Sequence, residues 1–198
     1  MREGIRQEQI VEAAIRRMAH YGIQKTTLSE VAEDVALSKQ ALAYYYPDKA
    51  TLVRAVVARI GTDYLQALRD AVAQTGEFAA ALEQLVLLRA RFHEQYFALF
   101  SDIEKEGGFR REEAAGMIRE AAAAEVAVLE GSYAEGVRRG SLRAAGRNTV
   151  RLIVDILTAL GRGIWRDCLP DAETFRETVR RQKETITLIC QGIEAGHA

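Results

Sequence analysis

Proline, the residue that interrupts helices most strongly, occurs only twice in this chain of 198 residues, at Pro47 and Pro170. A proline has no backbone N–H to donate, and its ring clashes with the preceding turn of a helix. The stretches between the prolines are rich in Ala, Leu, Glu and Arg, which have high helix propensity. Hydrophobic residues make up 48% of the chain and charged residues 28%, a balance typical of a globular protein with a sizeable core. The sequence therefore predicts an all-α fold.

The first fifty residues carry the pattern of a helix-turn-helix. A first amphipathic helix is predicted to end near Gly22, because apolar residues recur at helical spacing before it, namely Ile10, Val11, Ala14, Ile15 and Met18. Thr27 and Glu30 have the spacing of a capping box that starts a short second helix. Ser38 is placed to cap a third helix over residues 39–46, which Pro47 ends. Two short helices joined by a few residues form the helix-turn-helix motif.

Longer helices are predicted for the rest of the chain. Asp48 is placed to cap a fourth helix, and hydrophobic periodicity with glycine breaks indicates helices over about residues 49–74, 78–100, 111–138 and 150–164. A last helix begins after Asp171 and ends near Ile193. Along residues 150–164 two apolar seams lie on neighbouring faces, so this helix needs partners on two sides. Together with the helix-turn-helix before them, these helices predict two domains, at residues 1–48 and 49–198.

Two ungapped segments resemble the N-terminal region of the TetR/AcrR family of repressors. Residues 21–32 read YGIQKTTLSEVA and residues 37–49 read LSKQALAYYYPDK. The family pattern is roughly a glycine, then T-T-apolar-x-x-I-A, then S-K-G-T-L-Y-Y-Y-F-x-x-K. The resemblance implies about nine helices, with a DNA-binding domain at residues 1–48 and a ligand-sensing and dimerisation domain at 49–198. It also implies a homodimer formed by the last two helices, and a small-molecule effector that weakens binding to a palindromic operator on double-stranded DNA.

The start of the third helix holds the residues that we expect to read bases. A recognition helix enters the major groove with its N-terminal side chains against base edges, which here are Lys39, Gln40 and Ala41. Lys39 can donate to guanine or to a phosphate, Gln40 can pair with adenine, and the Ala41 methyl can meet a thymine methyl. This chain departs from the family pattern at Ala41 and Ala43, where the family has Thr and Tyr. These departures remove two groups that form hydrogen bonds in the family.

Other residues of this module are candidates for phosphate contacts. Tyrosine hydroxyls and amides at helix starts commonly contact phosphates, which makes Tyr44 and Tyr45 candidates. The alternative for Tyr44 is packing within the module. In the family, the lysine at the position of Lys49 contacts phosphate. Thr27 is favoured as a cap over a DNA contact, whereas its neighbour Ser29 is placed to reach a phosphate.

The larger domain offers candidates for an effector pocket and for a dimer surface. Effector pockets are mostly apolar with a few polar groups, and the pocket candidates are His93, Tyr96, Phe97, Phe100, Phe109, Tyr133 and Trp165. For any one of these residues, ordinary core packing is the alternative. The predicted dimer interface comes from one seam of residues 150–164 with the last helix, namely Val150, Ile153, Leu157, Leu160, Ile164, Val179, Ile186 and Ile189.

Composition argues against several other functions. Three histidines, two cysteines and the lack of a glycine-rich phosphate loop leave no constellation for an enzyme, a metal site or a cofactor in the sequence. No apolar run is long enough to cross a bilayer, and the start of the chain does not resemble a signal peptide, so we expect a cytoplasmic protein. The net charge of −1 and the alanines at 41 and 43 keep one alternative open. That alternative is a helical dimeric adaptor or sensor that does not read DNA specifically.

Overall fold

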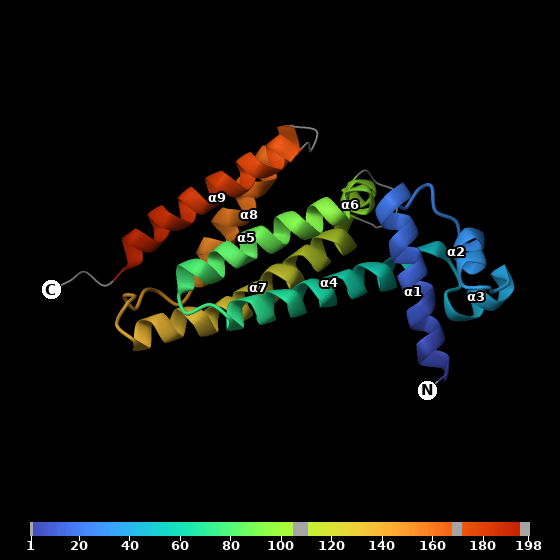
Figure 1. The fold of residues 1–198 in the computed structure, drawn as a ribbon, viewed down its shortest axis with the longest axis horizontal. Helices are drawn as coiled ribbons and strands as arrows, with labels where there is room; N and C mark the ends of the chain where they lie inside the picture. The colour runs from blue at the N-terminus through green and yellow to red at the C-terminus, as the bar shows by residue number, and fades with distance from the viewer. Residues whose placement is uncertain (1, 105–110, 168–171, 195–198) are drawn as a thin grey trace. The chain divides into compact units, whose positions relative to one another are not determined.

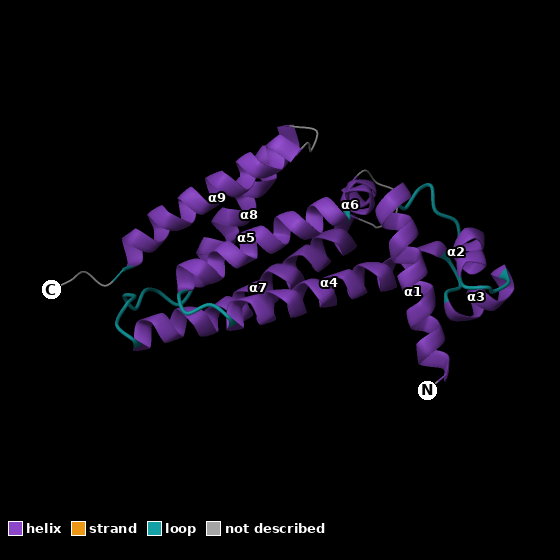
Figure 2. Cartoon of the chain, in the orientation of Figure 1, coloured by secondary structure: helices purple, strands orange, loops and turns teal. Residues whose placement is uncertain are grey.

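The protein is built from α-helices alone in the part of the chain that the structure describes. The structure is a computed structural model. It describes residues 2–104, 111–167 and 172–194, with the exception of the side chains of residues 2–3, 104, 111–115, 117–118, 162–167 and 172. Within these ranges it has no β-strand (Figure 2). The helices, labelled in Figure 1, are α1 (Arg2–Tyr21), α2 (Leu28–Asp34), α3 (Lys39–Tyr45), α4 (Lys49–Ala73), α5 (Phe78–Gln95), α6 (Phe97–Glu104), α7 (Arg111–Arg138), α8 (Thr149–Asp167) and α9 (Ala172–Ile193).

The helix predicted over residues 78–100 is two helices, α5 and α6, with a break at Tyr96. Apolar side chains continue at helical spacing through the break, because Phe92, Tyr96, Leu99 and Phe100 all pack into the same core. The i to i−4 hydrogen bonds also continue on both sides, from Tyr96 N to Phe92 O and from Phe100 N to Tyr96 O, each 3.0 Å. Hydrophobic periodicity therefore gives no signal that the helix is interrupted.

The chain folds into two compact units. The first unit comprises Met1–Asp63 with Phe92–Ile118, and the second comprises Tyr64–Arg91 with Arg119–Ala198. Helix α4 contributes its first part to the first unit and its last part to the second. The boundary that we predicted at residue 48 concerns function and stays a prediction, whereas the packing divides α4 after Asp63.

Each unit has its own hydrophobic core. In the first unit, α1, α2, α3, α4 and α6 bury apolar residues together, with Ile10, Met18, Leu42, Leu52 and Leu99 almost completely covered. Complete burial of a large aliphatic side chain contributes roughly 1.5–3 kcal/mol relative to exposure. The core of the second unit is formed by α4, α5, α7, α8 and α9. No described helix is both long and apolar enough to span a membrane.

Candidate nucleic-acid interface

Helix α2 starts at a complete capping box. The Thr27 hydroxyl accepts a hydrogen bond from the Glu30 amide at 3.3 Å, and the Glu30 carboxylate accepts one from the Thr27 amide at 2.7 Å. The same carboxylate also accepts from the Thr27 hydroxyl at 2.7 Å. These hydrogen bonds lower the pKa of Glu30. The capping predicted for Thr27 is therefore present, and it occupies the hydroxyl that would otherwise be available to a phosphate.

The turn between α2 and α3 is held by the backbone. Ala36 has a φ of 52°, in the left-handed region that residues with a Cβ rarely adopt. The amides of Ala36 and Leu37 donate to Glu33 O at 3.1 Å and to Ala32 O at 2.9 Å, so the strained residue lies inside a fully bonded turn. This turn sets the angle between the two short helices of the motif.

Helix α3 presents its N-terminal end to solvent and its middle to the core. The Ser38 hydroxyl accepts from the Ala41 amide at 3.1 Å and caps the helix. Leu42 is completely buried and anchors it, while Lys39 and Gln40 are exposed and Ala41 is half-buried. The three residues predicted to read bases are thus on the free first turn of a capped helix, as a recognition helix requires.

The three consecutive tyrosines have different environments. Tyr46 is buried in the core of the first unit, Tyr45 is half-buried against that core, and Tyr44 is 75% exposed. The Tyr44 and Tyr45 rings meet edge to face, with centroids 5.2 Å apart. Packing within the module, the alternative considered for Tyr44, therefore does not account for this residue. The exposed hydroxyl is available to a phosphate.

An arginine on α1 braces α2. The Arg17 guanidinium donates to both oxygens of Asp34, from Nε at 2.5 Å and from Nη2 at 2.9 Å, and its Nη1 lies 3.6 Å from the Glu30 carboxylate. The hydrogen bonds from Arg17 lower the pKa of Asp34. Sequence reasoning missed this pair, because its members are seventeen residues apart and no periodic pattern connects them.

Lys49 opens α4 beside the loop between α1 and α2. Its Nζ donates to Gln24 O at 3.3 Å, and the preceding Asp48 caps the helix by accepting from the Thr51 amide at 2.7 Å. That hydrogen bond lowers the pKa of Asp48. An ammonium group has three donors, so Lys49 can hold a phosphate while it contacts the loop. Ser29, the other predicted phosphate contact, is half-buried in the first turn of α2.

The described candidates for the effector pocket are divided between the two compact units. His93, Tyr96, Phe97 and Phe100 lie at the α5–α6 junction in the first unit, where the His93 ring stacks on Phe100 with centroids 6.0 Å apart. Burial lowers the pKa of His93.

Tyr133 belongs to the second unit and packs on Phe78. Its hydroxyl donates to Arg143 O at 2.9 Å and accepts from the Ala145 amide at 3.0 Å, which is a structural role. Phe109 and the Trp165 side chain lie outside the described residues. The effector pocket therefore stays a prediction.

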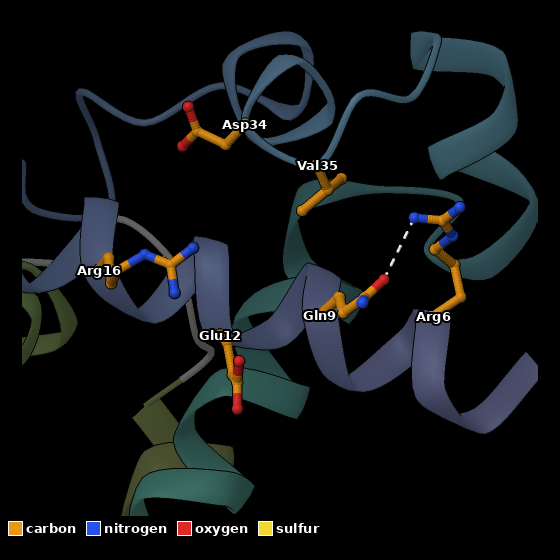
Figure 3. A pocket seen from close by; sticks show the side chains of 6 residues that line it. All are labelled: Arg6, Gln9, Glu12, Arg16, Asp34 and Val35. Atoms are coloured by element: carbon orange, nitrogen blue, oxygen red, sulfur yellow. Dashed lines mark hydrogen bonds between the residues drawn. The ribbon is translucent and has the colours of Figure 1, made fainter.

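A groove of about 330 Å³ lies on the first unit, between α1 and the end of α2 (Figure 3). Its lining is polar, and Arg6 Nη1 donates to Gln9 Oε1 at 3.1 Å within it. The remaining lining residues are Glu12, Arg16, Asp34 and Val35. This groove lacks the apolar lining of a typical small-molecule pocket.

The predicted dimer seam is largely covered within the chain itself. Val150, Ile153, Leu157 and Ile186 are buried in the core of the second unit, while Leu160, Val179 and Ile189 are half-buried and the Ile164 side chain is not described. The neighbouring seam of α8 is exposed instead, with Leu152 60% and Ile156 40% accessible, and Leu188 of α9 is 70% accessible. Among the described residues of α8, this second seam is the more accessible one, and the dimer interface stays a prediction.

Sequence reasoning also missed a buried polar network in the second unit. Glu125 of α7 is buried, and its carboxylate accepts hydrogen bonds from Tyr64 of α4 at 2.5 Å and from Arg89 Nε of α5 at 2.8 Å. Arg89 Nη2 also pairs with the other carboxylate oxygen. Burial and the Glu125 charge hold the pKa of Tyr64 well above its usual value, so the hydroxyl keeps its proton. The three residues come from separate helices, and no local pattern brings them together.

Two short capped helices joined by a tight turn, the second with an exposed first turn, have the geometry of a helix-turn-helix. Residues 10–56 match the family described as "Bacterial regulatory proteins, tetR family". A curated protein of Pseudomonas putida, "Probable HTH-type transcriptional regulator ArpR", is 32% identical over 81 residues, which is 41% of this chain and 36% of that protein.

Solved structures extend the likeness to the whole fold. A transcriptional regulator from Cytophaga hutchinsonii superposes with a TM-score of 0.84 at 23% identity, covering 94% of this chain and 97% of that one. A TetR-family regulator from Mesorhizobium loti gives a TM-score of 0.71 at 14% identity, covering 98% and 99%. The match to the tetR family model therefore concerns residues 10–56, and the solved structures show that the whole chain shares the fold of these regulators.

Proposed function

We propose that this protein is a homodimeric transcription repressor, which binds a palindromic operator in the cytoplasm and releases it when a small molecule binds. The observation that carries the proposal is the start of α3, where Ser38 caps the helix and leaves Lys39 and Gln40 exposed. A bidentate contact from Gln40 to adenine would contribute roughly 1–3 kcal/mol of base discrimination. Ala41 would add an apolar contact to a thymine methyl.

Phosphate contacts would supply most of the affinity. The exposed Tyr44 hydroxyl and the Lys49 ammonium are the strongest candidates, and Tyr45 and Ser29 are further candidates. Each phosphate neutralised by a cation releases counterions, so binding should weaken steeply as the salt concentration rises. Thr27 would act through its cap, since its hydroxyl is already engaged with Glu30.

Dimerisation would bring two recognition helices to successive major grooves. The exposed seam of Leu152 and Ile156 on α8, with Leu188 on α9, is the surface that we assign to the second copy. Exposed apolar side chains of this kind are costly to leave in water, and α8 and α9 pack against each other, which suits a helical bundle between copies. Release of DNA would follow if effector binding shifts α4, which belongs to both compact units.

The test is selection of duplexes from a random DNA pool by the purified protein, followed by sequencing. An enriched inverted repeat, with half-sites about one helical turn apart or slightly more, would support a dimeric, sequence-reading regulator. No enrichment by a sample that is folded and dimeric would refute it.

The second candidate function is a dimeric adaptor or sensor without specific DNA binding, which the alanines at positions 41 and 43 favour. Both alanines are half-buried on α3 and have no hydrogen-bonding side chain for a base. An adaptor should show no salt-dependent binding to duplex DNA, whereas a regulator with several phosphate contacts should lose affinity steeply.

A further inference from the structure

The loop between α1 and α2 is held by hydrogen bonds from several directions. Gly22 N donates to Met18 O at 3.0 Å, and the buried Thr26 hydroxyl donates to Gly22 O at 2.9 Å. Both backbone polar groups of Gln24 form hydrogen bonds. Its carbonyl accepts from Lys49 Nζ, and its amide donates to the Asp102 carboxylate at 2.9 Å.

Asp102 comes from α6, which lies far from this loop in the sequence. A Cβ built on Gly22 would lie 2.5 Å from Asp102 Oδ2 and 3.4 Å from Ala98 O, so α6 approaches the loop as closely as a glycine allows. Gly22 also has a φ of +83°, which a larger residue would adopt only with strain. The glycine is thus needed twice, for the turn and for the approach of α6.

Helix α6 is part of the same compact unit as the helix-turn-helix. Leu99 is completely buried and Tyr96 nearly so, in a core shared with α1 and α4. Asp102 therefore projects from a well-anchored helix and can fix the position of the loop. The loop leads within three residues of Gln24 to Thr27, the cap that sets where α2 begins.

We propose that Asp102 is a positioning residue for operator binding, which holds the α1–α2 loop and through it the start of α2. This assignment rests on the proposed function. A carboxylate in a unit that must approach a polyanion opposes binding by its charge. The hydrogen bond to Gln24 gives a reason for its presence that outweighs this repulsion. If Asp102 acts only through its charge, removal of the carboxylate should tighten DNA binding. If Asp102 positions the loop, its removal should weaken DNA binding.

The experiment compares three variants in titrations with an operator selected by the wild-type protein. Asp102→Ala should weaken binding about three- to tenfold, the equivalent of one lost hydrogen bond. Asp102→Asn should stay close to wild type, because its amide oxygen still accepts from Gln24 N. Glu94→Ala is the matched control, since Glu94 is an exposed acid of the same unit and its loss should leave binding unchanged or slightly tighter. The exchange rate of the Gln24 amide should rise in Asp102→Ala and not in Asp102→Asn.

The results of these titrations distinguish failure of the Asp102 assignment from failure of the proposed function. Binding by Asp102→Ala as tight as that of Glu94→Ala would overturn the assignment, as would equal losses in Asp102→Ala and Asp102→Asn. If Asp102→Ala unfolds, Asp102→Ser takes its place, because its shorter side chain does not reach Gln24. A wild-type protein that selects no duplex would overturn the proposed function together with this assignment. Selection by the wild type with no change in the variants overturns this assignment alone.

Discussion

Replacement of Glu125 by alanine should strongly destabilise the second unit. The side chains of Glu125 and Arg89 are only 6% and 18% exposed, and the carboxylate accepts hydrogen bonds from both Arg89 and Tyr64. Without the carboxylate, the buried Arg89 guanidinium keeps its charge but loses its ion-pair partner. Removal of one member of a buried ion pair costs about 3–5 kcal/mol. For a chain of this length that corresponds to a fall in Tm of roughly 6–20 °C.

For the same network we expect a change in stability of the opposite sign, or no change, when all three residues are replaced together. Replacing all three members by apolar residues of similar size, with Tyr64→Phe, Arg89→Met and Glu125→Leu, removes the buried polar groups of this network together. Such replacements range from neutral to stabilising by about 4 kcal/mol, because the cost of desolvating the charges disappears. The triple variant should therefore be far more stable than Glu125→Ala, although it carries more substitutions.

The assay is urea unfolding followed by circular dichroism, at one fixed protomer concentration because the stability of a dimer depends on concentration. Glu83→Ala is the control, since Glu83 pairs with Lys183 at 3.0 Å on the surface of the same unit, where both side chains are about 40% exposed. Its loss should cost at most about 1 kcal/mol. A Glu125→Ala variant no less stable than Glu83→Ala, or a triple variant less stable than Glu125→Ala, would refute the reasoning.

Further outcomes concern the DNA-binding unit and the dimer. In titrations, Lys49→Ala should weaken binding to all duplexes alike and reduce the slope of log K against log salt concentration by about 0.9 per lost phosphate contact; an unchanged slope would exclude that contact. In a repeated selection, Gln40→Ala should change the base preference at one position per half-site, and an unchanged preference would exclude Gln40 as a base contact. Ile156→Asp should yield monomers in sedimentation, whereas Leu87→Asp, at a residue 39% exposed compared with 40% for Ile156, should not. A dimeric Ile156→Asp would disprove the assigned surface. Because Asp34 has a lowered pKa when folded, its stabilisation is present above its ordinary pKa of 3.8 and lost as the pH falls through the folded value. Unfolding free energies measured from pH 2 to 6 should therefore fall less steeply for Asp34→Asn, and parallel curves would contradict this.

Local signals in the sequence were sufficient for the helix-turn-helix. The caps at Thr27 and Ser38 each join residues three positions apart, and both have the predicted geometry. Pairs that tertiary packing brings together were not predictable in this way, and they include Arg17 with Asp34 and Asp102 with Gln24. No rule of spacing links residues on different helices before the packing is known.

Helix α8 shows a second kind of information that the sequence pattern does not contain, namely which apolar face packs inside the chain. Its two apolar seams have the same residue types and the same period, so the sequence predicts two partners without saying which seam faces which. The structure covers the seam of Ile153 and Leu157 with the chain's own helices and leaves Leu152 and Ile156 exposed. Val150, Ile153 and Leu157 of the seam that we first assigned to the dimer are thus buried within the second unit, and the dimer interface itself stays a prediction.

The discontinuity of the first unit bears on attempts to exchange recognition modules between regulators. Its core is completed by Tyr96 and Leu99, which follow the helix-turn-helix by some fifty residues. A graft of residues 1–48 alone onto a foreign sensor would uncover the apolar side chains that those residues normally cover. A working chimera would have to transplant α6 as well, or redesign the host helix that takes its place. Without such a redesign, the first unit can be transferred only as two segments of chain moved together.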